Sequence, residues 1–344
     1  MVKLGSSLVV DGQGAPRLDV LRDVAAAVAG HVHDGARIAV VSSGAIALGG
    51  GRAGLDARRQ TLARLQAASA LGQAELQQHW RTVFEEHGLN VAQVLLTAVD
   101  LTERRSYLNV RDALNALFDV GAVPVLNEND ATSTDEISFG DNDVLAAQVA
   151  VLLRARLLVL LTAVGGVLAR PPGEGDHEVI ADGSALAGAV FGPVSALGRG
   201  GIESKVAAAR LAAAGGVEAV VAAPPDLAAL LDGGAAGTRF TAEPRAESSF
   251  KLWLRYGKQP ASRVRIDDGA VAALRSGGAS LLAVGVIDWS DDFRAGDGVL
   301  VCDREQREVA RGIASVDAAA LAGRPSDVEV VHRDRLALVE PAAG

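Results

Sequence analysis

Aromatic residues and cysteine are nearly absent from this chain. Phe, Trp and Tyr together make up 3% of its 344 residues, so that its core must be built from Val, Leu, Ile and Ala. Cys302 is the one cysteine, which excludes an internal disulfide framework and is typical of a reducing compartment. Hydrophobic residues make up 49% and charged residues 22% of the chain, which excludes wholesale disorder.

The sequence also lacks an unbroken apolar segment long enough to cross a membrane. Its most apolar stretch, 144–169, is interrupted by Gln148, Arg154 and Arg156, and the pieces are shorter than the ~18 to 20 residues that a span requires. The first residues show neither the basic start nor the long apolar run of a signal peptide. We therefore expect a soluble protein of the cytoplasm that does not associate with a membrane.

Lysine is scarce as well. Only four of the 33 basic residues are lysines, namely Lys3, Lys205, Lys251 and Lys258, and the net charge is −9. The acidic balance argues against a protein whose main task is to neutralise a nucleic-acid backbone. A lysine is a compact point charge that suits phosphate, whereas a guanidinium is a wide planar fork. A lysine in a glycine-rich setting, as at positions 3 and 205, therefore calls for a functional reason.

The length of the chain predicts two domains. Residues 1–243 alternate short apolar runs with helical patterns, which predicts an α/β domain with an open, mainly parallel sheet sandwiched by helices. Residues 244–262 are richer in charge and predict a linker. Residues 263–340 contain closely spaced short runs separated by Gly and Asp turns, which predicts a small, mostly β barrel.

The hydrophobic periodicity predicts individual elements. Helices are expected at 19–33, 56–87, 101–120, 143–153 and 203–214. Strands are expected at 36–41, 91–96, 122–126, 156–161 and 217–222. In the second domain, strands are expected at 263–266, 280–286, 298–302, 308–313 and 328–331.

Four polar loops stand out in the first domain, each placed by the prediction at the carboxyl end of a strand, where open α/β sheets bind ligands. A lone lysine is more often a solvated charge, and a Ser-Gly or Asn/Asp turn is more often only a turn. The glycine-rich phosphate motif G-x-x-x-x-G-K-[ST] does not occur. The four together, however, are hard to ascribe to chance. The four loops cover residues 2–7, residues 42–45, the pair of segments 127–130 and 140–143, and residues 198–205.

The residue types in these loops suit phosphoryl transfer. Two lysines and a glycine-rich turn can balance the charge that develops on a transferring phosphoryl group. The Asn/Asp loop offers amides and carboxylates, which recognise the ammonium and carboxylate of an amino-acid-like substrate. No Ser, Cys or His nucleophile is needed if the acceptor is itself a carboxylate.

These motifs resemble those of the glutamate 5-kinases, in the amino acid kinase family, which carry a C-terminal PUA domain. The resemblance extends over nearly the whole chain. In the first domain it rests on V-K-L-G-S-S at 2–7, S-S-G-A-I-A at 42–47, Y-L-N-V-R-D-A-L at 107–114, P-V-L-N-E-N-D at 124–130, F-G-D-N-D-V-L at 139–145 and the 198–205 loop. In the second domain the resemblance rests on residues 267–270, 280–282 and 310–312.

The resemblance implies the amino acid kinase fold and a reaction. ATP with Mg²⁺ would phosphorylate the side-chain carboxylate of L-glutamate to L-glutamyl 5-phosphate, the opening step of proline synthesis. The catalytic residues would be Lys3, Lys205 and Asp143, with Asp143 holding the lysines in place. The glutamate-binding residues would be Ser43, Asp130, Asn142, Asn127 and Asp141. The nucleotide-binding residues would be Lys3, Gly5, Thr162, Ala163, Arg199, Gly200, Gly201 and Lys205, and no protein ligand to a metal is expected.

The resemblance also implies partners. We expect a homo-oligomer, either a dimer or a tetramer, and contact with the next enzyme of proline synthesis. PUA modules in other proteins bind RNA. Binding of RNA is not expected here, because the chain is acidic and lacks a stripe of aromatic and basic residues.

The chain departs from the family pattern in ways that keep other hypotheses open. Ala163 stands where the family has Asp, Arg199 replaces a small hydroxyl residue, and the segment 167–172 lacks the usual aromatic character. Lys3 follows only two residues, so that either the first strand is short or the start lies further upstream. The alternatives are a regulatory protein that has lost nucleotide turnover, an RNA-binding protein, and a related kinase acting on aspartate, acetylglutamate or a nucleoside monophosphate.

Overall fold

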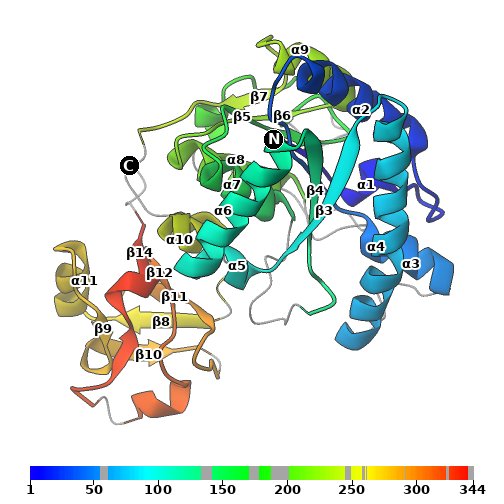
Figure 1. The fold of residues 1–344 in the computed structure, drawn as a ribbon. Helices are drawn as coiled ribbons and strands as arrows, with labels where there is room; N and C mark the ends of the chain where they lie inside the picture. The colour runs from blue at the N-terminus through cyan, green and yellow to red at the C-terminus, as the bar shows by residue number, and fades with distance from the viewer. Residues whose placement is uncertain are drawn as a thin grey trace. The chain divides into compact units, whose positions relative to one another are not determined.

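The computed structural model describes residues 1–54, 61–132, 142–169, 178–186, 201–244, 249–257, 260, 262–290, 292–322 and 325–339. The chain divides into two units, Met1–Ala246 and Glu247–Gly344 (Figure 1), each with its own hydrophobic core. The division falls inside the segment 244–262 that the sequence predicts as a linker. The domain bounds 1–243 and 263–340 stay predictions.

A seven-stranded sheet forms the centre of the first unit. Its strand order is β3-β4-β2-β1-β5-β6-β7, and every pairing is parallel except that of β7 with β6. The mainly parallel α/β fold is therefore confirmed. Edge strand β7 was not predicted, because three residues are too few for a periodic signal. The strands are β1 Val2–Leu4, β2 Val40–Ser42, β3 Asn90–Leu96, β4 Ala122–Glu128, β5 Leu157–Leu161, β6 Glu218–Ala222 and β7 Thr238–Phe240.

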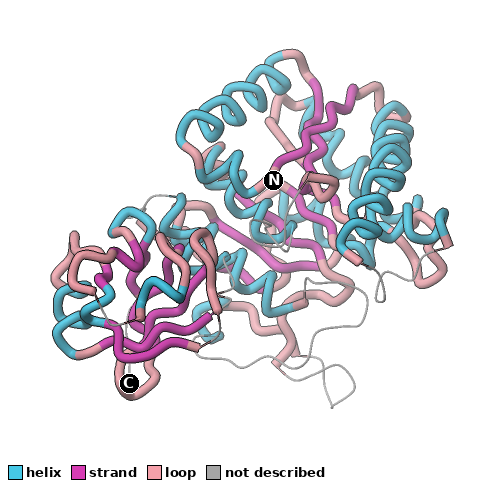
Figure 2. Tube along the Cα trace, turned by 90° about the horizontal axis from the view of Figure 1, so that it is seen from below, coloured by secondary structure: helices cyan, strands magenta, loops and turns pink. Residues whose placement is uncertain are grey.

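Helices lie on both sides of this sheet, as Figure 2 shows. Helices α2, α4 and α9 share one core with the strands, whereas α7 and α8 contact the strands from the other side. The described helices are α1 Ser6–Val9, α2 Leu18–His33, α3 Ala45–Ala53, α4 Leu62–Glu85, α5 Ala98–Thr102, α6 Arg104–Asp119, α7 Asn142–Leu152, α8 Ile202–Ala214 and α9 Leu227–Leu231. Single 3₁₀ turns cover Gly183–Leu186 and Pro224–Asp226. None of the described helices combines the length and the apolar character needed to cross a membrane.

The helix predicted over 101–120 is two helices, α5 and α6. The break comes at Glu103, whose carboxylate accepts hydrogen bonds from the backbone N–H groups of Arg105 and Ser106 at 3.0 and 2.8 Å. This side chain caps a new helix, because it satisfies donors that the first turn of a helix leaves unpaired. The predicted strand 36–41 is also shorter than expected and begins at Val40.

Strand register brings four polar segments to one edge of the sheet. Leu4 pairs with Ser42 on one side and with Leu161 on the other, and Val41 pairs with Leu126. The residues that follow these positions are Gly5, Ser43, Thr162 and Asn127. All four therefore lie where neighbouring parallel strands reach their carboxyl ends, which is the ligand-binding edge of such sheets.

The second unit is mostly β, as predicted. Its described strands form a five-stranded sheet of order β10-β8-β11-β12-β14 and a two-stranded sheet of β13 with β9. No described pairing joins β10 to β14, so closure into a barrel stays a prediction. The elements are α10 Ser249–Leu252, a π-helical turn Trp253–Gly257, β8 Ser262–Ile266, α11 Asp268–Arg275, β9 Leu281–Leu282, β10 Val286–Trp289, β11 Gly298–Cys302, β12 Glu308–Ile313, β13 Glu329–Val331 and β14 Leu336–Leu338, with 3₁₀ turns at Ala283–Gly285, Ala318–Leu321 and Arg333–Arg335.

Helices α10 and α11, strand β14 and the division of one expected strand were not predicted. Helix α11 begins at an Asp267 cap, whose carboxylate accepts from the N–H of Ala270 at 2.8 Å. The single strand expected over 280–286 is divided into β9 and β10 by the 3₁₀ turn that contains Gly285. Eight-residue helices and two-residue strands produce weak periodicity, which is why the sequence pattern missed both.

Candidate functional site

Three charged side chains from three elements meet at the carboxyl edge of the sheet. Lys3 Nζ lies 2.5 Å from Asp143 Oδ1, and Lys205 Nζ lies 2.9 Å from Asp143 Oδ2. Val2 and Leu4 belong to the core that includes α2, so the alternation along β1 turns Lys3 to the opposite face, where α7 contacts β1. Asp143 comes from the first turn of α7 and Lys205 from the first turn of α8. We call these three residues the charged cluster.

The charged cluster is buried. Asp143 is 0%, Lys3 1% and Lys205 5% exposed. Burial by itself raises the pKa of the Asp143 carboxyl, but the ammonium groups of Lys3 and Lys205 outweigh it and hold that pKa below its usual value. Asp143 therefore stays ionised at neutral pH, and the three side chains together carry one net positive charge. Such a group suits the neutralisation of a phosphate better than the removal of a proton.

Gly5 lies beside both ammonium groups. A Cβ added to Gly5 would lie 3.9 Å from Lys3 Nζ and 3.9 Å from Lys205 Nζ. The two lysines therefore converge on one position next to the backbone, at the start of α1. A ligand phosphate can approach both charges there because residue 5 has no side chain.

A second group, which we call the amide cluster, consists of Ser43, Asn127 and Asn142. Asn142 Nδ2 donates to Ser43 Oγ at 3.0 Å and to Asn127 Oδ1 at 2.7 Å. The N–H of Glu128 donates to Asn127 Oδ1 and Asn142 Oδ1, at 2.9 and 3.1 Å. Gly44 follows Ser43 with a φ of +116° and starts α3, and this left-handed conformation permits the sharp turn from β2.

Helix α4 supplies two contacts to this side of the site that the sequence analysis missed. Gln73 Oε1 accepts from Asn127 Nδ2 at 2.7 Å, and Ser69 Oγ donates to Asp130 Oδ2 at 2.9 Å. Ser69, Gln73 and Gln77 recur every four residues and are all buried. This spacing marks one helix face, but the sequence alone does not distinguish a buried polar stripe from a solvated one.

The predicted nucleotide-side residues that the structure describes lie at the same edge. Thr162 follows β5 directly, and its N–H donates to the carbonyl of Ala222 at 2.9 Å. Ala163 is exposed. Gly201 is the N-cap of α8, so Lys205 lies in the first turn of this helix, which agrees with the helix predicted over 203–214. Because α8 connects the parallel neighbours β5 and β6, its first turn still lies at the carboxyl edge. Asp141, Arg199, Gly200 and residues 170–172 lie outside the described residues.

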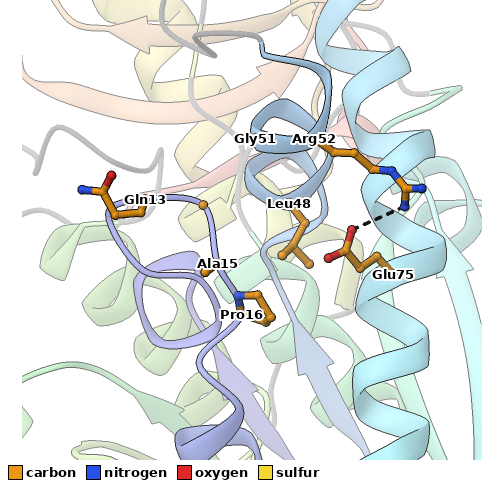
Figure 3. A pocket seen from close by; sticks show the side chains of 8 residues that line it. Gln13, Ala15, Pro16, Leu48, Gly51, Arg52 and Glu75 are labelled. Carbon is orange, nitrogen blue, oxygen red and sulfur yellow. Dashed lines mark ion pairs between the residues drawn. The ribbon is translucent and has the colours of Figure 1, made fainter.

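A separate cavity of about 500 Å³ lies at the C-terminal half of α3 (Figure 3). The loop residues Gln13 and Pro16 form one side of it, and the paired side chains of Arg52 and Glu75, 3.8 Å apart, form another. None of the predicted site residues lines this cavity. No group of three or more His, Cys, Asp or Glu side chains arranged to hold a metal ion occurs in the described part of the chain.

Family comparisons agree with this division of the chain. Residues 1–223 match the model of the Amino acid kinase family, and residues 262–330 match that of the PUA domain. The protein named glutamate 5-kinase from Pseudomonas fluorescens is 42% identical over 363 aligned residues, which cover 98% of this chain and 97% of that protein. The glutamate 5-kinase of Sphingopyxis alaskensis is 42% identical over 359 residues, with the same coverage.

The fold also matches a solved structure. A crystal structure of a protein from Aeropyrum pernix K1 superposes with a TM-score of 0.50 at 17% identity, covering 70% of this chain and 99% of that one. At this identity the match supports the fold alone.

Proposed function

The chain belongs to the amino acid kinase family, in its glutamate 5-kinase branch, and we infer that it phosphorylates the side-chain carboxylate of L-glutamate with ATP. The product is L-glutamyl 5-phosphate, and the reaction opens proline synthesis. The observation that carries the proposal is the pair of buried lysines on Asp143 at the sheet edge that also holds the amide cluster. The charged cluster suits a transferring phosphoryl group, and the amide cluster suits an amino acid.

The proposed mechanism needs no general base. The acceptor carboxylate of glutamate has an ordinary pKa of about 4.3, so it is ionised and nucleophilic at neutral pH. Lys3 and Lys205 stabilise the negative charge that spreads over the phosphoryl oxygens in the transition state. Asp143 holds both ammonium groups in position, and its lowered pKa agrees with a group that stays ionised throughout.

The proposed glutamate site uses the amide cluster together with Asp130 and Asp141. Amide and hydroxyl groups of Ser43, Asn127 and Asn142 are suited to the carboxylates of the substrate, and the carboxylate of Asp130 is suited to its α-ammonium group. The hydrogen bonds already present among these groups support the proposal, because a preorganised site loses less entropy on binding.

The proposed nucleotide site includes Lys3, Gly5, Thr162, Ala163, Arg199, Gly200, Gly201 and Lys205. The two ammonium groups that lie beside Gly5 are suited to a phosphate of ATP. Mg²⁺ is commonly bound through phosphate oxygens together with one or two carboxylates, and we propose that it enters this site on ATP. When bound, Mg²⁺ would neutralise phosphate charge next to the lysines.

A trapping assay tests the proposal. Glutamyl phosphate reacts with hydroxylamine to a hydroxamate, which can be measured beside ADP release, with glutamate, aspartate, acetylglutamate and a nucleoside monophosphate as acceptors. We expect product with glutamate and ATP. Product only with another acceptor would replace the substrate assignment, and ATP binding without turnover on any acceptor would favour the regulatory alternative.

RNA binding by the second unit is not part of the proposal. Three of its arginines are paired with carboxylates within the same unit: Arg265 with Asp288, Arg311 with Glu308, and Arg307 with Asp303. Paired guanidinium groups offer little net positive field for a phosphate backbone. Homo-oligomer formation, contact with the next enzyme of proline synthesis and a cytoplasmic location stay predictions.

A further inference from the structure

Helices α3 and α4 cross with their backbones in contact. A Cβ added to Gly72 would lie 1.9 Å from the carbonyl oxygen of Ala45, and one added to Gly49 would lie 1.9 Å from that of Ala68. Real Cβ atoms do not approach backbone so closely, so any side chain at either glycine would force the helices apart. The crossing therefore fixes α4 relative to α3, and α3 starts directly after Ser43 and Gly44.

The same crossing fixes the two polar side chains that α4 extends toward the site. Ser69 follows Ala68 and Gln73 follows Gly72, so each stands next to a residue of the crossing. Ser69 contacts Asp130, and Gln73 contacts Asn127. Gln73 is 8% exposed, and its oxygen meets Asn127, which is 2% exposed.

Gln73 also determines which way the Asn127 amide points. Its Oε1 is an acceptor, so Asn127 must turn Nδ2 toward it and Oδ1 away from it. Oδ1 then accepts from the N–H of Glu128 and from Asn142 Nδ2, and Asn142 Nδ2 also reaches Ser43 Oγ. If the Asn127 amide were reversed, its NH₂ group would face two other donors, the N–H of Glu128 and Asn142 Nδ2. The direction of the Asn127 amide is thus set from two sides, by the acceptor from α4 and by the backbone N–H of Glu128.

We propose that Gln73 is a positioning residue for the acid acceptor: it fixes the Asn127 amide, and through Asn127 it fixes Asn142 and Ser43 in the orientation that binds glutamate. The proposal rests on the function inferred above for the amide cluster. Gln73 acts only through Asn127, so its removal weakens binding of the acceptor and leaves the nucleotide side unchanged.

The test compares the same substitution at two positions of α4. Gln73→Leu and Gln73→Met remove the acceptor and keep most of the side-chain volume. Gln77→Leu is the matched control, because Gln77 lies one turn further along α4 and is 7% exposed. No described group donates a hydrogen bond to Gln77 Oε1. Steady-state kinetics, equilibrium binding of glutamate and thermal unfolding are measured for all four proteins.

We expect both Gln73 variants to raise the KM and the Kd for glutamate on the order of tenfold, since Asn127 Nδ2 is left buried without its acceptor. The KM for ATP should stay at the wild-type value in every variant. Gln77→Leu should keep the wild-type KM for glutamate. Equal changes in glutamate KM at positions 73 and 77, or no change in either Gln73 variant, would overturn the proposal.

A double-mutant cycle shows whether the effect passes through Asn127. In an Asn127→Ala background, Gln73→Leu should have no further effect on the Kd for glutamate, because the side chain it orients is gone. Additive losses would show that Gln73 acts by another route and would overturn the proposal. Failure of the function inferred above is distinguishable, because the wild-type protein would then release no glutamate-dependent ADP.

Discussion

The charged cluster and the amide cluster lie at the same edge of one sheet, yet they are held together by different physics. The charged cluster joins Lys3, Asp143 and Lys205 through ionic contacts of 2.5 and 2.9 Å at buried positions. The amide cluster joins neutral groups through hydrogen bonds whose directions must agree. Loss of a charge in the charged cluster removes an ionic partner from other buried charges, whereas loss of a partner in the amide cluster changes the orientation of a side chain.

This difference indicates a division of labour. A buried net charge is strong and nearly independent of direction, which suits the several oxygens of a phosphoryl group. A directional set of neutral donors and acceptors discriminates between similar acids. Substitutions in the charged cluster should therefore lower kcat and stability, and substitutions in the amide cluster should mainly change the KM for glutamate.

Asp143→Asn should have the largest effect. It removes the carboxylate that contacts both buried ammonium groups, which is expected to cost about 3 to 5 kcal/mol in the free energy of unfolding. With both lysines displaced, kcat should fall by at least about 100-fold. Urea unfolding and ADP release measure the two effects. Asp232→Asn is the control, because its carboxylate is 74% exposed and its pair with His31 should contribute at most about 1 kcal/mol. A folded Asp143→Asn protein with near-normal kcat would contradict the assignment.

Lys205→Arg should come next. A guanidinium keeps the charge but replaces a point with a wide fork, so kcat should fall about 100- to 1000-fold while stability changes much less. Lys251→Arg in the second unit is the matched control and should leave kcat unchanged. If kcat of folded Lys205→Arg equals that of wild type, this lysine has a structural role only.

The pH dependence of stability should separate the two clusters as well. The folded-state pKa of Asp143 is lowered, so its contribution is fully present above the unfolded pKa of about 3.9 and is lost as pH falls below it. The difference in unfolding free energy between wild type and Asp143→Asn should be constant from about pH 7 to pH 5 and shrink below about pH 4. Urea titrations at several pH values measure it. A difference that disappears near neutral pH would mean that Asp143 is not held ionised by the lysines.

A smaller effect is expected on the nucleotide side. Ala163 is exposed, so Ala163→Asp can be accommodated, and it would introduce the residue that the sequence resemblance implies at this position. One added hydrogen bond should tighten the Kd for ATP by at most about tenfold and leave the KM for glutamate unchanged. Arg199→Thr should weaken ATP binding. Tight binding in wild type that neither substitution changes would show that other contacts hold the nucleotide.

Removal of the second unit should have the smallest effect on chemistry. All described residues of both clusters lie before Ala246, and the two units have separate cores. A chain ending at Ala246 should fold and keep its kcat within about threefold. Circular dichroism and glutamate-dependent ADP release test this. A folded but inactive truncation would show that the second unit helps to build the site.

Much of the fold could be predicted from hydrophobic periodicity. Strand β5 is five buried apolar residues and α2 carries a regular apolar stripe, so both were found close to their true bounds. Short or capped elements were missed. The break between α5 and α6 depends on the Glu103 side chain, and β7 consists of three residues at the sheet edge. Local hydrogen bonds decide such boundaries, and periodicity does not report them.

The sequence by itself determined which residue types were available for chemistry: four lysines, two of them beside glycine turns, and a concentration of Asn and Asp in one loop. Only the tertiary structure decided their partners. Register between β1, β2 and β5 aligned the loops, and α7 brought Asp143 between Lys3 and Lys205. The contact of Gln73 with Asn127 spans 54 residues and depends on the crossing of α3 with α4. Residues so far apart in the chain meet only after the helices pack, and for that reason no local pattern predicted this contact.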